Sequence, residues 1–295
     1  MRGAKPEQAL ERAVLLASAL RPREHVLVAC SGGPDSVALA SLLAELQSKL
    51  ELTLTLGHVN HAQRASAWQD EAVVLRLGAM FDFPVATIDL PPTPHNEADL
   101  RKGRYHGLGE LASRYGATAV ATGHTAEDQT ETVLLALFRG TGLSGLRGMP
   151  ERRPLATGIA LVRPLLGIGR ASLRRYCHRR MLPYALDPSN ADLGGRRNAV
   201  RAALEDLRGV FPALDAAVSR TSDIVRREVE AAEPAALRRR VRAILRDAEV
   251  LRDVSFEHIE AAARGAKNAR SGRFFITRGV ELRIKDGEFQ LRRSE

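Results

Sequence analysis

Short apolar runs alternate with longer amphipathic segments along the first two thirds of the chain. The runs HVLVAC (25–30), LTLTLGHVN (52–60), PVATIDL (84–90), ATAVATGH (117–124) and GIALVRPLL (158–166) have the length and β-branched content of buried strands. Helical patterns lie between them, among others over 37–50, 68–80 and 128–138. This alternation predicts an α/β fold with a doubly wound, mostly parallel sheet, in which ligands bind beyond the carboxyl ends of the strands.

The pattern changes near Ala202. Helical periodicity continues to Val250 with an interruption at Pro234, and residues 274–293 alternate like two or three short strands. We therefore predict one domain over 1–208 and a smaller, mainly helical C-terminal domain over 209–295 that ends in short strands.

Composition narrows the classes of function. No stretch approaches the roughly 18 apolar residues of a membrane span. Cys30 and Cys177 stand far apart without a CxxC pair, which argues against a zinc ribbon, a four-cysteine iron–sulfur site or a disulfide scaffold and indicates a reducing cytoplasm. The net charge is +9, and the whole excess lies after residue 150. A basic second half favours polyanion capture there, although an arginine-rich genome would give the same composition.

The segment SGGPDS (31–36) separates the first predicted strand from its helix. Gly32 and Gly33 permit positive φ and a close approach of phosphate, and the N-terminus of the following helix attracts anions. Ser31 and Ser36 add hydroxyl donors. The lysine of a GxxxxGK[ST] loop and the GxGxxG spacing are both absent. Asp35 would repel a bare phosphate, so it indicates a divalent cation or a base near the reacting centre.

SGGPDS resembles the PP-loop of the N-type ATP pyrophosphatases. Further blocks resemble, in order, the tRNA(Ile)-lysidine synthases: HVNHAQR (58–64), NEADLRKGRY (96–105), GHTAEDQTET (123–132), RPLL (163–166), DPSN (187–190) and RRNAVR (196–201). The resemblance implies ligation of free L-lysine to C2 of the first anticodon cytidine of an isoleucine tRNA with a CAU anticodon. It also implies ATP as co-substrate, Mg²⁺, an adenylated tRNA intermediate, and release of AMP and pyrophosphate, with catalysis in the domain over 1–208 and tRNA binding in the domain over 209–295. Since no apolar stretch is long enough for a membrane span, we expect no membrane partner; a homodimer is left open.

The expected ATP contacts come from SGGPDS and from the polar ends of later strands. Asp35 is also the expected Mg²⁺ ligand. The apolar neighbours of His58 leave a packing role open, and His124 is left between a structural role, a phosphate contact and a proton acceptor. The set is Ser31, Gly32, Gly33, Pro34, Asp35, Ser36, His58, Asn60, Arg64, Gly123 and His124.

Asp128 and Glu131 form the predicted lysine receptor. They lie three apart on a predicted helix, so both carboxylates face one side and suit an ammonium group. The lysine-binding acids of the family match these two positions; a solvated helix face is the alternative. The amine must be neutral to attack C2, and Asp35 is the first candidate for its proton acceptor, with Asp128 the second.

Arginines complete the predicted site. Arg101 and Arg104 lie one helical turn apart, as in a forked phosphate clamp. Arg104 and Arg201 match arginines of the family motifs and join Asp35 and Asp128 in the predicted catalytic set. The dense basic run from 170 to 180, whose arginines surround Tyr176, predicts either contact with a tRNA backbone or a solvated helix face. The predicted tRNA-binding residues are Arg170, Arg174, Arg175 and Arg197.

Other readings start from the same loop. A 2-thiocytidine sulfurtransferase would need a cysteine pair or iron–sulfur ligands, which Cys30 and Cys177 do not provide. A small-molecule adenylating ligase is disfavoured by the basic second half. A non-catalytic RNA-binding module is disfavoured because the serines and Asp35 of SGGPDS, and the Asp128–Glu131 pair, are all intact.

Overall fold

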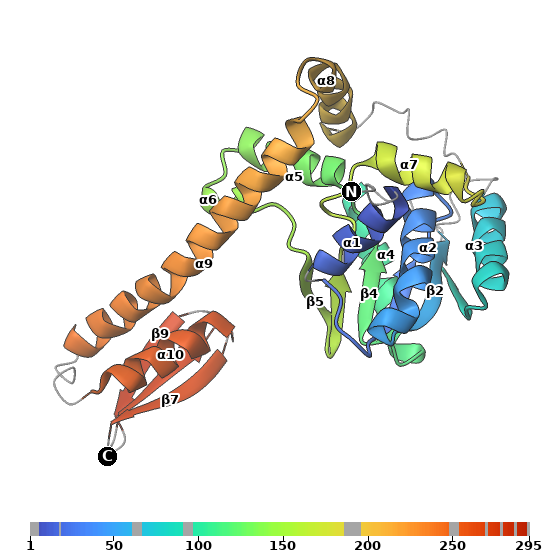
Figure 1. Ribbon diagram of the computed structural model, residues 1–295. Helices are drawn as coiled ribbons and strands as arrows, with labels where there is room; N and C mark the ends of the chain where they lie inside the picture. The colour runs from blue at the N-terminus through green and yellow to red at the C-terminus, as the bar shows by residue number, and fades with distance from the viewer. Residues whose placement is uncertain are drawn as a thin grey trace, which may run out of the picture. The chain divides into compact units, whose positions relative to one another are not determined.

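The computed structural model describes residues 6–17, 19–60, 67–90, 97–185, 196–247, 254–268, 271–277, 280–285 and 288–293 (Figure 1). Two compact units divide the chain, Met1–Ser222 and Asp223–Glu295. The division falls within the long helix α9 (Leu214–Asp247), beyond the predicted boundary at 208.

The later boundary has a local cause. The turn after α8 (Arg196–Val210) is closed by Arg208, whose Nε donates to Asp215 Oδ2 at 2.8 Å, so the start of α9 stays with α8. Helix α8 in turn packs on α5 (Ala126–Phe138) of the first unit. The two compact units therefore meet near Ser222, while the boundary at 208 stays a prediction.

Among the described residues of the first unit, six strands form one sheet in the order β3-β2-β1-β4-β6-β5. Strands β3, β2, β1, β4 and β6 run parallel, and β5 is antiparallel to β6. The strands are β1 (His25–Ala29), β2 (Thr53–Asn60), β3 (Val85–Asp89), β4 (Ala119–Thr122), β5 (Arg152–Ala156) and β6 (Ile159–Val162). The predicted α/β fold with a mostly parallel sheet is confirmed.

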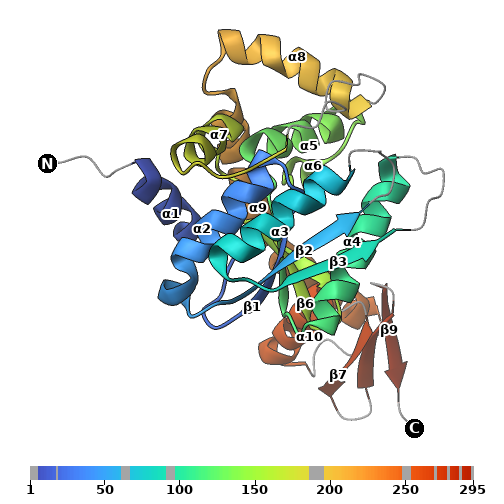
Figure 2. The same ribbon diagram turned by 90° about the vertical axis from the view of Figure 1, so that its right-hand side faces the viewer.

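Helices cover both faces of this sheet, because successive apolar side chains of a strand point to opposite faces and both faces are therefore apolar. In β1, Val26 and Val28 enter one core and Leu27 enters the other. The first core is covered by α1 (Pro6–Leu16), α2 (Pro34–Leu50), α3 (Ala67–Phe81) and α7 (Arg170–Arg179), the second by α4 (Glu97–Arg114). Figure 2 shows α2 and α3 side by side over the sheet. The short helix α6 (Leu143–Leu146) packs on α5.

Strand β5 was not predicted. Its sequence RRPLA is polar and contains Pro154, which interrupts an apolar pattern. Proline is tolerated here because, among the described strands, β5 is the edge of the sheet and pairs only with β6. Gly158, at φ +73°, makes the turn between the two strands.

In the second unit, α10 (Phe256–Asn268) packs on β7 (Ser271–Thr277), which continues into β8 (Val280–Lys285) and β9 (Glu288–Arg293) as an antiparallel meander. Val241 and Leu245 of α9 join Ile259, Leu282 and their neighbours in a small core. These strands confirm the predicted short strands at the end of the chain.

Helix α9 corrects one expectation. It continues without interruption through Pro234 over 34 residues. A proline removes one intrahelical hydrogen bond and crowds one preceding carbonyl, which bends a helix without necessarily ending it.

Candidate active site

The SGGPDS segment joins the end of β1 to the start of α2, with Pro34 at the first turn. Ser36 Oγ accepts the N–H of Ser31 at 3.2 Å and donates to the carbonyl of Gly33 at 2.9 Å, so the loop is closed upon itself. Gly32 has φ +82°, and a Cβ there would lie 3.0 Å from the backbone of Asp70. Only glycine fits this position, while Gly33 has φ −77° and needs no special freedom. The segment therefore presents the N-terminus of a 17-residue helix as an anion site.

Asp35 lies in the first turn of α2, directly against the loop that follows β4. A Cβ on Gly123 would lie 3.1 Å from the carbonyl group of Asp35, so glycine permits this close approach. Burial raises the pKa of Asp35 to about 6, with Asp128 and Glu127 adding to the rise and Arg170 opposing it. One carboxylate oxygen, Oδ1, is buried and without a hydrogen-bond partner.

This orphaned oxygen tests whether the residues fit Mg²⁺. In the described part of the chain, no group of three His, Cys, Asp or Glu side chains is arranged to hold a metal ion. Mg²⁺ commonly binds through one or two carboxylates together with substrate phosphates and water. A single unpartnered carboxylate oxygen beside a phosphate cradle fits that mode of binding.

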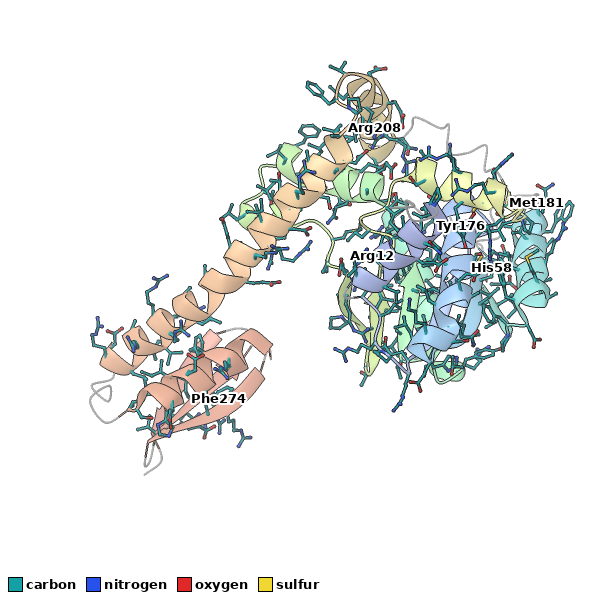
Figure 3. The ribbon with its side chains drawn as sticks, viewed as in Figure 1. Arg12, His58, Tyr176, Met181, Arg208 and Phe274 are labelled. Carbon is teal, nitrogen blue, oxygen red and sulfur yellow. The ribbon has the colours of Figure 1, made fainter. Side chains whose placement is uncertain are left out.

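The two predicted histidines have different surroundings. His58 is 4% exposed, and its Nδ1 donates to the carbonyl of Cys30 at 2.9 Å, which supports the packing role (Figure 3). His124 Nδ1 lies 2.8 Å from Thr122 Oγ1. Burial lowers the pKa of His124 to about 3, Asp128 opposes this, and nearby arginines add to it. A neutral imidazole of that pKa is a weak proton acceptor at neutral pH.

Two further residues were expected to contact ATP, Asn60 and Arg64. Asn60 is the last residue of β2, and its backbone carbonyl accepts the N–H of Leu90 at 2.8 Å. Arg64 lies outside the described residues.

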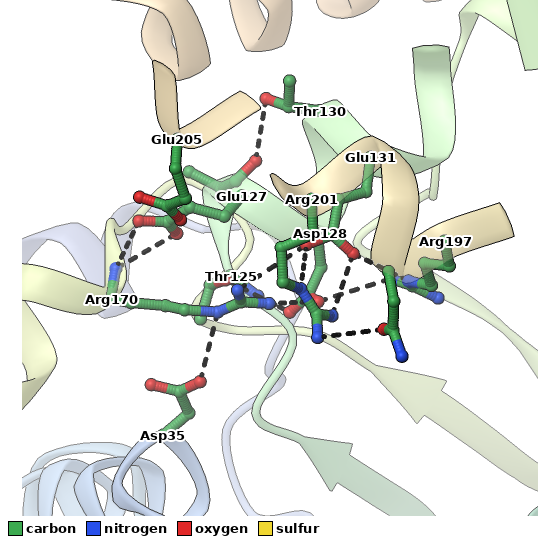
Figure 4. Close-up of polar contacts among 12 residues, drawn as sticks. Asp35, Thr125, Glu127, Asp128, Thr130, Glu131, Arg170, Arg197, Arg201 and Glu205 are labelled. Atoms are coloured by element: carbon green, nitrogen blue, oxygen red, sulfur yellow. Dashed lines mark hydrogen bonds and ion pairs between the residues drawn. The ribbon is translucent and has the colours of Figure 1, made fainter. Parts of the chain in front are cut away.

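The acid pair on α5 faces inward, as its spacing predicts, and arginines surround it (Figure 4). Glu131 is 0% exposed; Arg197 Nε and Arg201 Nε donate to its two oxygens at 2.7 and 2.9 Å. Asp128 Oδ1 accepts Arg170 Nη2 at 2.6 Å and Arg197 Nη2 at 3.3 Å. Burial opposes ionisation, yet Arg170 and its neighbours hold the pKa of Asp128 below its ordinary value. The alternative of a solvated helix face is excluded.

Arg170 connects this pair to the SGGPDS segment. Its Nε lies 3.5 Å from Asp35 Oδ2, while its Nη2 reaches Asp128 (Figure 4). Its position is fixed by Glu127, whose Oε1 and Oε2 accept the backbone N–H of Arg170 at 2.8 and 3.1 Å. Glu127 thus caps the N-terminus of α7, where a negative charge is favoured by the helix dipole. One side chain therefore spans the distance from the anion site to the acid pair.

Known proteins resemble this chain in sequence and in fold. The model of the PP-loop domain family matches residues 6–207. The tRNA(Ile)-lysidine synthase of Gloeobacter violaceus is 40% identical over 72% of this chain and 66% of that protein. Those of Salinispora tropica (41% identical; 75% and 68% covered) and Salinispora arenicola (40%; 79% and 71%) are similar. The chain belongs to the tRNA(Ile)-lysidine synthase family.

The matched segments span about two thirds of the length of these relatives. Among solved structures, the U34-tRNA thiolase NcsA from Methanococcus maripaludis with its [4Fe-4S] cluster superposes with a TM-score of 0.64. That match has 17% identity over 75% of this chain and 79% of the thiolase, and it shows a shared fold. The predicted family and its enzyme class, a ligase that forms carbon–nitrogen bonds, are confirmed, and the sulfurtransferase alternative is less supported. No described helix has the length and apolar character that a membrane span requires.

In this lysidine synthase family member, the structure separates the arginines predicted to bind tRNA. Arg174 and Arg175 are exposed on α7. Arg170 and Arg197 instead bind the acid pair. The sequence could not show these contacts, because the partners lie 42 and 66 residues apart in the chain. Tyr176 is 1% exposed and hydrogen-bonded to Ser41 Oγ at 2.9 Å, so it belongs to the core and does not face a ligand (Figure 3).

The two predicted catalytic arginines lie in different surroundings. Arg201 donates to Glu131 from α8. Arg104 lies on α4, with its guanidinium 5.5 Å from the centroid of the Tyr105 ring. Arg163, the first residue of the RPLL block, had no predicted role, and the structure also places it at Tyr105. It directly follows β6, but the predicted strand ran through it to residue 166, which hid its position at a strand end.

Proposed function

We propose that the chain ligates free L-lysine to C2 of the first anticodon cytidine of isoleucine tRNA with a CAU anticodon, using ATP and Mg²⁺. One observation carries the proposal beyond family membership: Arg170 contacts both Asp35 of the ATP loop and Asp128 of the acid pair. A site for activation by ATP and a receptor for an amine therefore lie within the reach of one guanidinium group.

Activation of the cytosine uses the β1–α2 loop. The backbone N–H groups at the start of α2 and the hydroxyl of Ser31 are placed to hold the phosphates of ATP, while the C2 oxygen attacks the α-phosphate. Asp35 would hold Mg²⁺ through its unpartnered Oδ1. When bound, the cation supplies positive charge to the departing pyrophosphate. Arg170 adds a second positive charge beside the same carboxylate.

Lysine binding must exchange partners at the acid pair, because arginines already fill it. Free lysine carries two ammonium groups and one carboxylate. An ammonium group takes the place of a guanidinium on Asp128 or Glu131, and the released arginine then pairs with the carboxylate of lysine. Charges stay balanced, which a buried site requires.

Loss of a proton from the ε-amine must precede its attack on C2. Asp128 is a weak acceptor, because its arginine partners hold its pKa below the ordinary value. Asp35, whose pKa burial raises to about 6 in the metal-free chain, stays the first of the two predicted acceptors at times when it holds no cation.

The test is incorporation of labelled lysine into a transcript of isoleucine tRNA with a CAU anticodon. We expect incorporation and pyrophosphate release that depend on ATP, and none with a transcript that carries uridine at the target position. Asp35→Ala should abolish pyrophosphate release. Folded protein that incorporates no lysine, while another substrate triggers pyrophosphate release, would overturn the proposal.

A further inference from the structure

Four arginines from three segments converge on one tyrosine, beside the acid pair and separate from it. We call Arg101, Arg104, Arg153, Arg163 and Tyr105 the Tyr105 cluster. The guanidinium carbons of Arg101, Arg104 and Arg153 lie 5.1, 5.5 and 5.2 Å from the ring centroid. Arg101 Nη2 donates to the phenol oxygen at 3.2 Å, and Arg163 lies near enough to the phenol for the two groups to shift each other's pKa. The first two come from α4, Arg153 from β5, and Arg163 follows β6.

The positive charge of the cluster is not neutralised by the part of the chain that the structure describes. No ion pair joins any of its four arginines to a described carboxylate, whereas the three arginines at the acid pair all have one. Arg163 is only 2% exposed; its Nη1 donates to the carbonyl of Pro150 at 2.7 Å, and its Nε is buried without a partner. Burial lowers the pKa of Arg104 and of Arg163, which Tyr105 opposes and neighbouring arginines reinforce.

Such an arrangement is unfavourable unless an anion completes it. A buried guanidinium with an unused N–H carries a desolvation cost, and like charges on one ring repel each other. A guanidinium group has several N–H donors, so a contact with the ring leaves others available for a further acceptor. Guanidinium edges match the paired oxygens of a phosphate better than any other side chain does.

The position of the cluster indicates which phosphate. Strands β4 and β6 are neighbours in the sheet, and they lead to His124 and Arg163 respectively. Arg163, Arg104 and Arg101 all act on the pKa of His124, as does Asp128. His124 is therefore close enough to both the cluster and Asp128 for each to act on it. The loop at the end of β1 already offers a cradle for the ATP phosphates, so the cluster is available to a phosphate from another source.

We propose that the Tyr105 cluster is a second phosphate-binding site, which holds a backbone phosphate of the RNA substrate next to the target nucleotide. The source of this phosphate rests on the proposed function. Pyrophosphate shares the same chemistry, so the two sources are separated by experiment.

The first experiment measures binding of a fluorescent anticodon stem-loop RNA by anisotropy, without ATP or lysine. Arg101→Gln and Arg153→Gln, both partly exposed and therefore compatible with folding, should each weaken binding by about tenfold and reduce the salt slope by about 1. Arg114→Gln is the matched control, because Arg114 lies on the same helix α4 but pairs with Glu110. It should bind as the unmodified chain does.

A parallel titration with inorganic pyrophosphate alone identifies the source. Unchanged pyrophosphate affinity in the same two variants supports an RNA phosphate. Loss of pyrophosphate affinity with unchanged RNA affinity overturns that assignment, and unchanged affinity for both overturns the site itself. Normal RNA binding through the cluster without lysine incorporation would instead reject the proposed function and leave the site standing.

A spectroscopic readout tests the cluster without any variant arginine. The surrounding arginines lower the pKa of Tyr105 against the opposing effect of burial. A phosphate bound among them reduces the positive field, so RNA binding should raise the pH at which the tyrosinate absorbance appears. Tyr105→Phe should remove this component; its persistence in that variant, or the absence of a shift on RNA binding, would count against the cluster.

Discussion

Replacement of Glu131 by glutamine is the sharpest test of the arrangement at the acid pair. The side chain of Glu131 is fully buried, and Arg197 and Arg201 contact its oxygens at 2.7, 2.9 and 3.2 Å. Glutamine keeps the shape but removes the charge and presents an NH₂ group to one guanidinium. Arg197 and Arg201 then remain beside a neutral amide, with Arg170 also within 3.6 Å of this position and Asp128 as the nearby anion.

The magnitude follows from burial. Breaking a buried ion pair by removing one partner costs roughly 3–5 kcal/mol, out of the roughly 5–15 kcal/mol that stabilises a domain. The side chains of Arg197 and Arg201 are 21% and 24% exposed, so water compensates part of the loss. We expect Glu131→Gln to lower the free energy of unfolding by about 3 kcal/mol, the lower end of that range.

Glu45 offers a matched control in the same unit. It pairs with Arg180 on the surface, where the two side chains are 40% and 37% exposed. An exposed pair of this kind contributes about 0–1 kcal/mol. Glu45→Gln should therefore leave the free energy of unfolding nearly unchanged.

The free energy of unfolding of both variants is measured by urea unfolding followed by circular dichroism. The urea midpoints are compared with a common m value, the dependence of that free energy on urea concentration. In lysine incorporation at low temperature, Glu131→Gln should raise the KM for lysine and leave the KM for ATP unchanged. If Glu131→Gln unfolds at the same urea concentration as Glu45→Gln, the carboxylate is not buried among arginines in solution and the reasoning fails. An unchanged KM for lysine would separately remove Glu131 from the lysine receptor.

Two further predictions concern the loop and the α8–α9 turn. Gly32→Ala should weaken ATP binding at least tenfold and destabilise the fold by about 1–3 kcal/mol, because φ is +82° and the new Cβ meets Asp70 at 3.0 Å. Gly33→Ala, at φ −77°, should retain ATP affinity when both variants are titrated with ATP in a calorimeter; equal losses in the two variants would contradict the loop geometry. Burial would raise the pKa of Asp215, but Arg208 holds it below the ordinary value. Its contribution to stability is thus present above the unfolded pKa of about 3.9 and is lost as pH falls through the folded pKa. Urea midpoints of Asp215→Asn should therefore change less with pH in that acidic window than those of the unmodified chain, and parallel profiles would count against the ion pair.

The parts of the site that the sequence predicted are those set by neighbouring residues. SGGPDS lies between a strand and a helix, and that order alone places a helix N-terminus at the loop. Asp128 and Glu131 share a helix face because three residues make nearly one turn. In contrast, Pro154 hid an edge strand, since its tolerance depends on having a neighbour on one side only.

Sequence by itself determined the α/β alternation, the anion-binding loop and the inward face of the acid pair, because each depends on local backbone geometry. Tertiary structure alone decided what those carboxylates contact. Their arginine partners stand 42 to 70 residues away in the chain, and only the packing of α7 and α8 brings them to α5. The same holds for the Tyr105 cluster, where α4, β5 and the end of β6 meet. The spacing of residues in the sequence does not show which distant charged side chains will be buried together, because that depends on how the helices pack on the sheet.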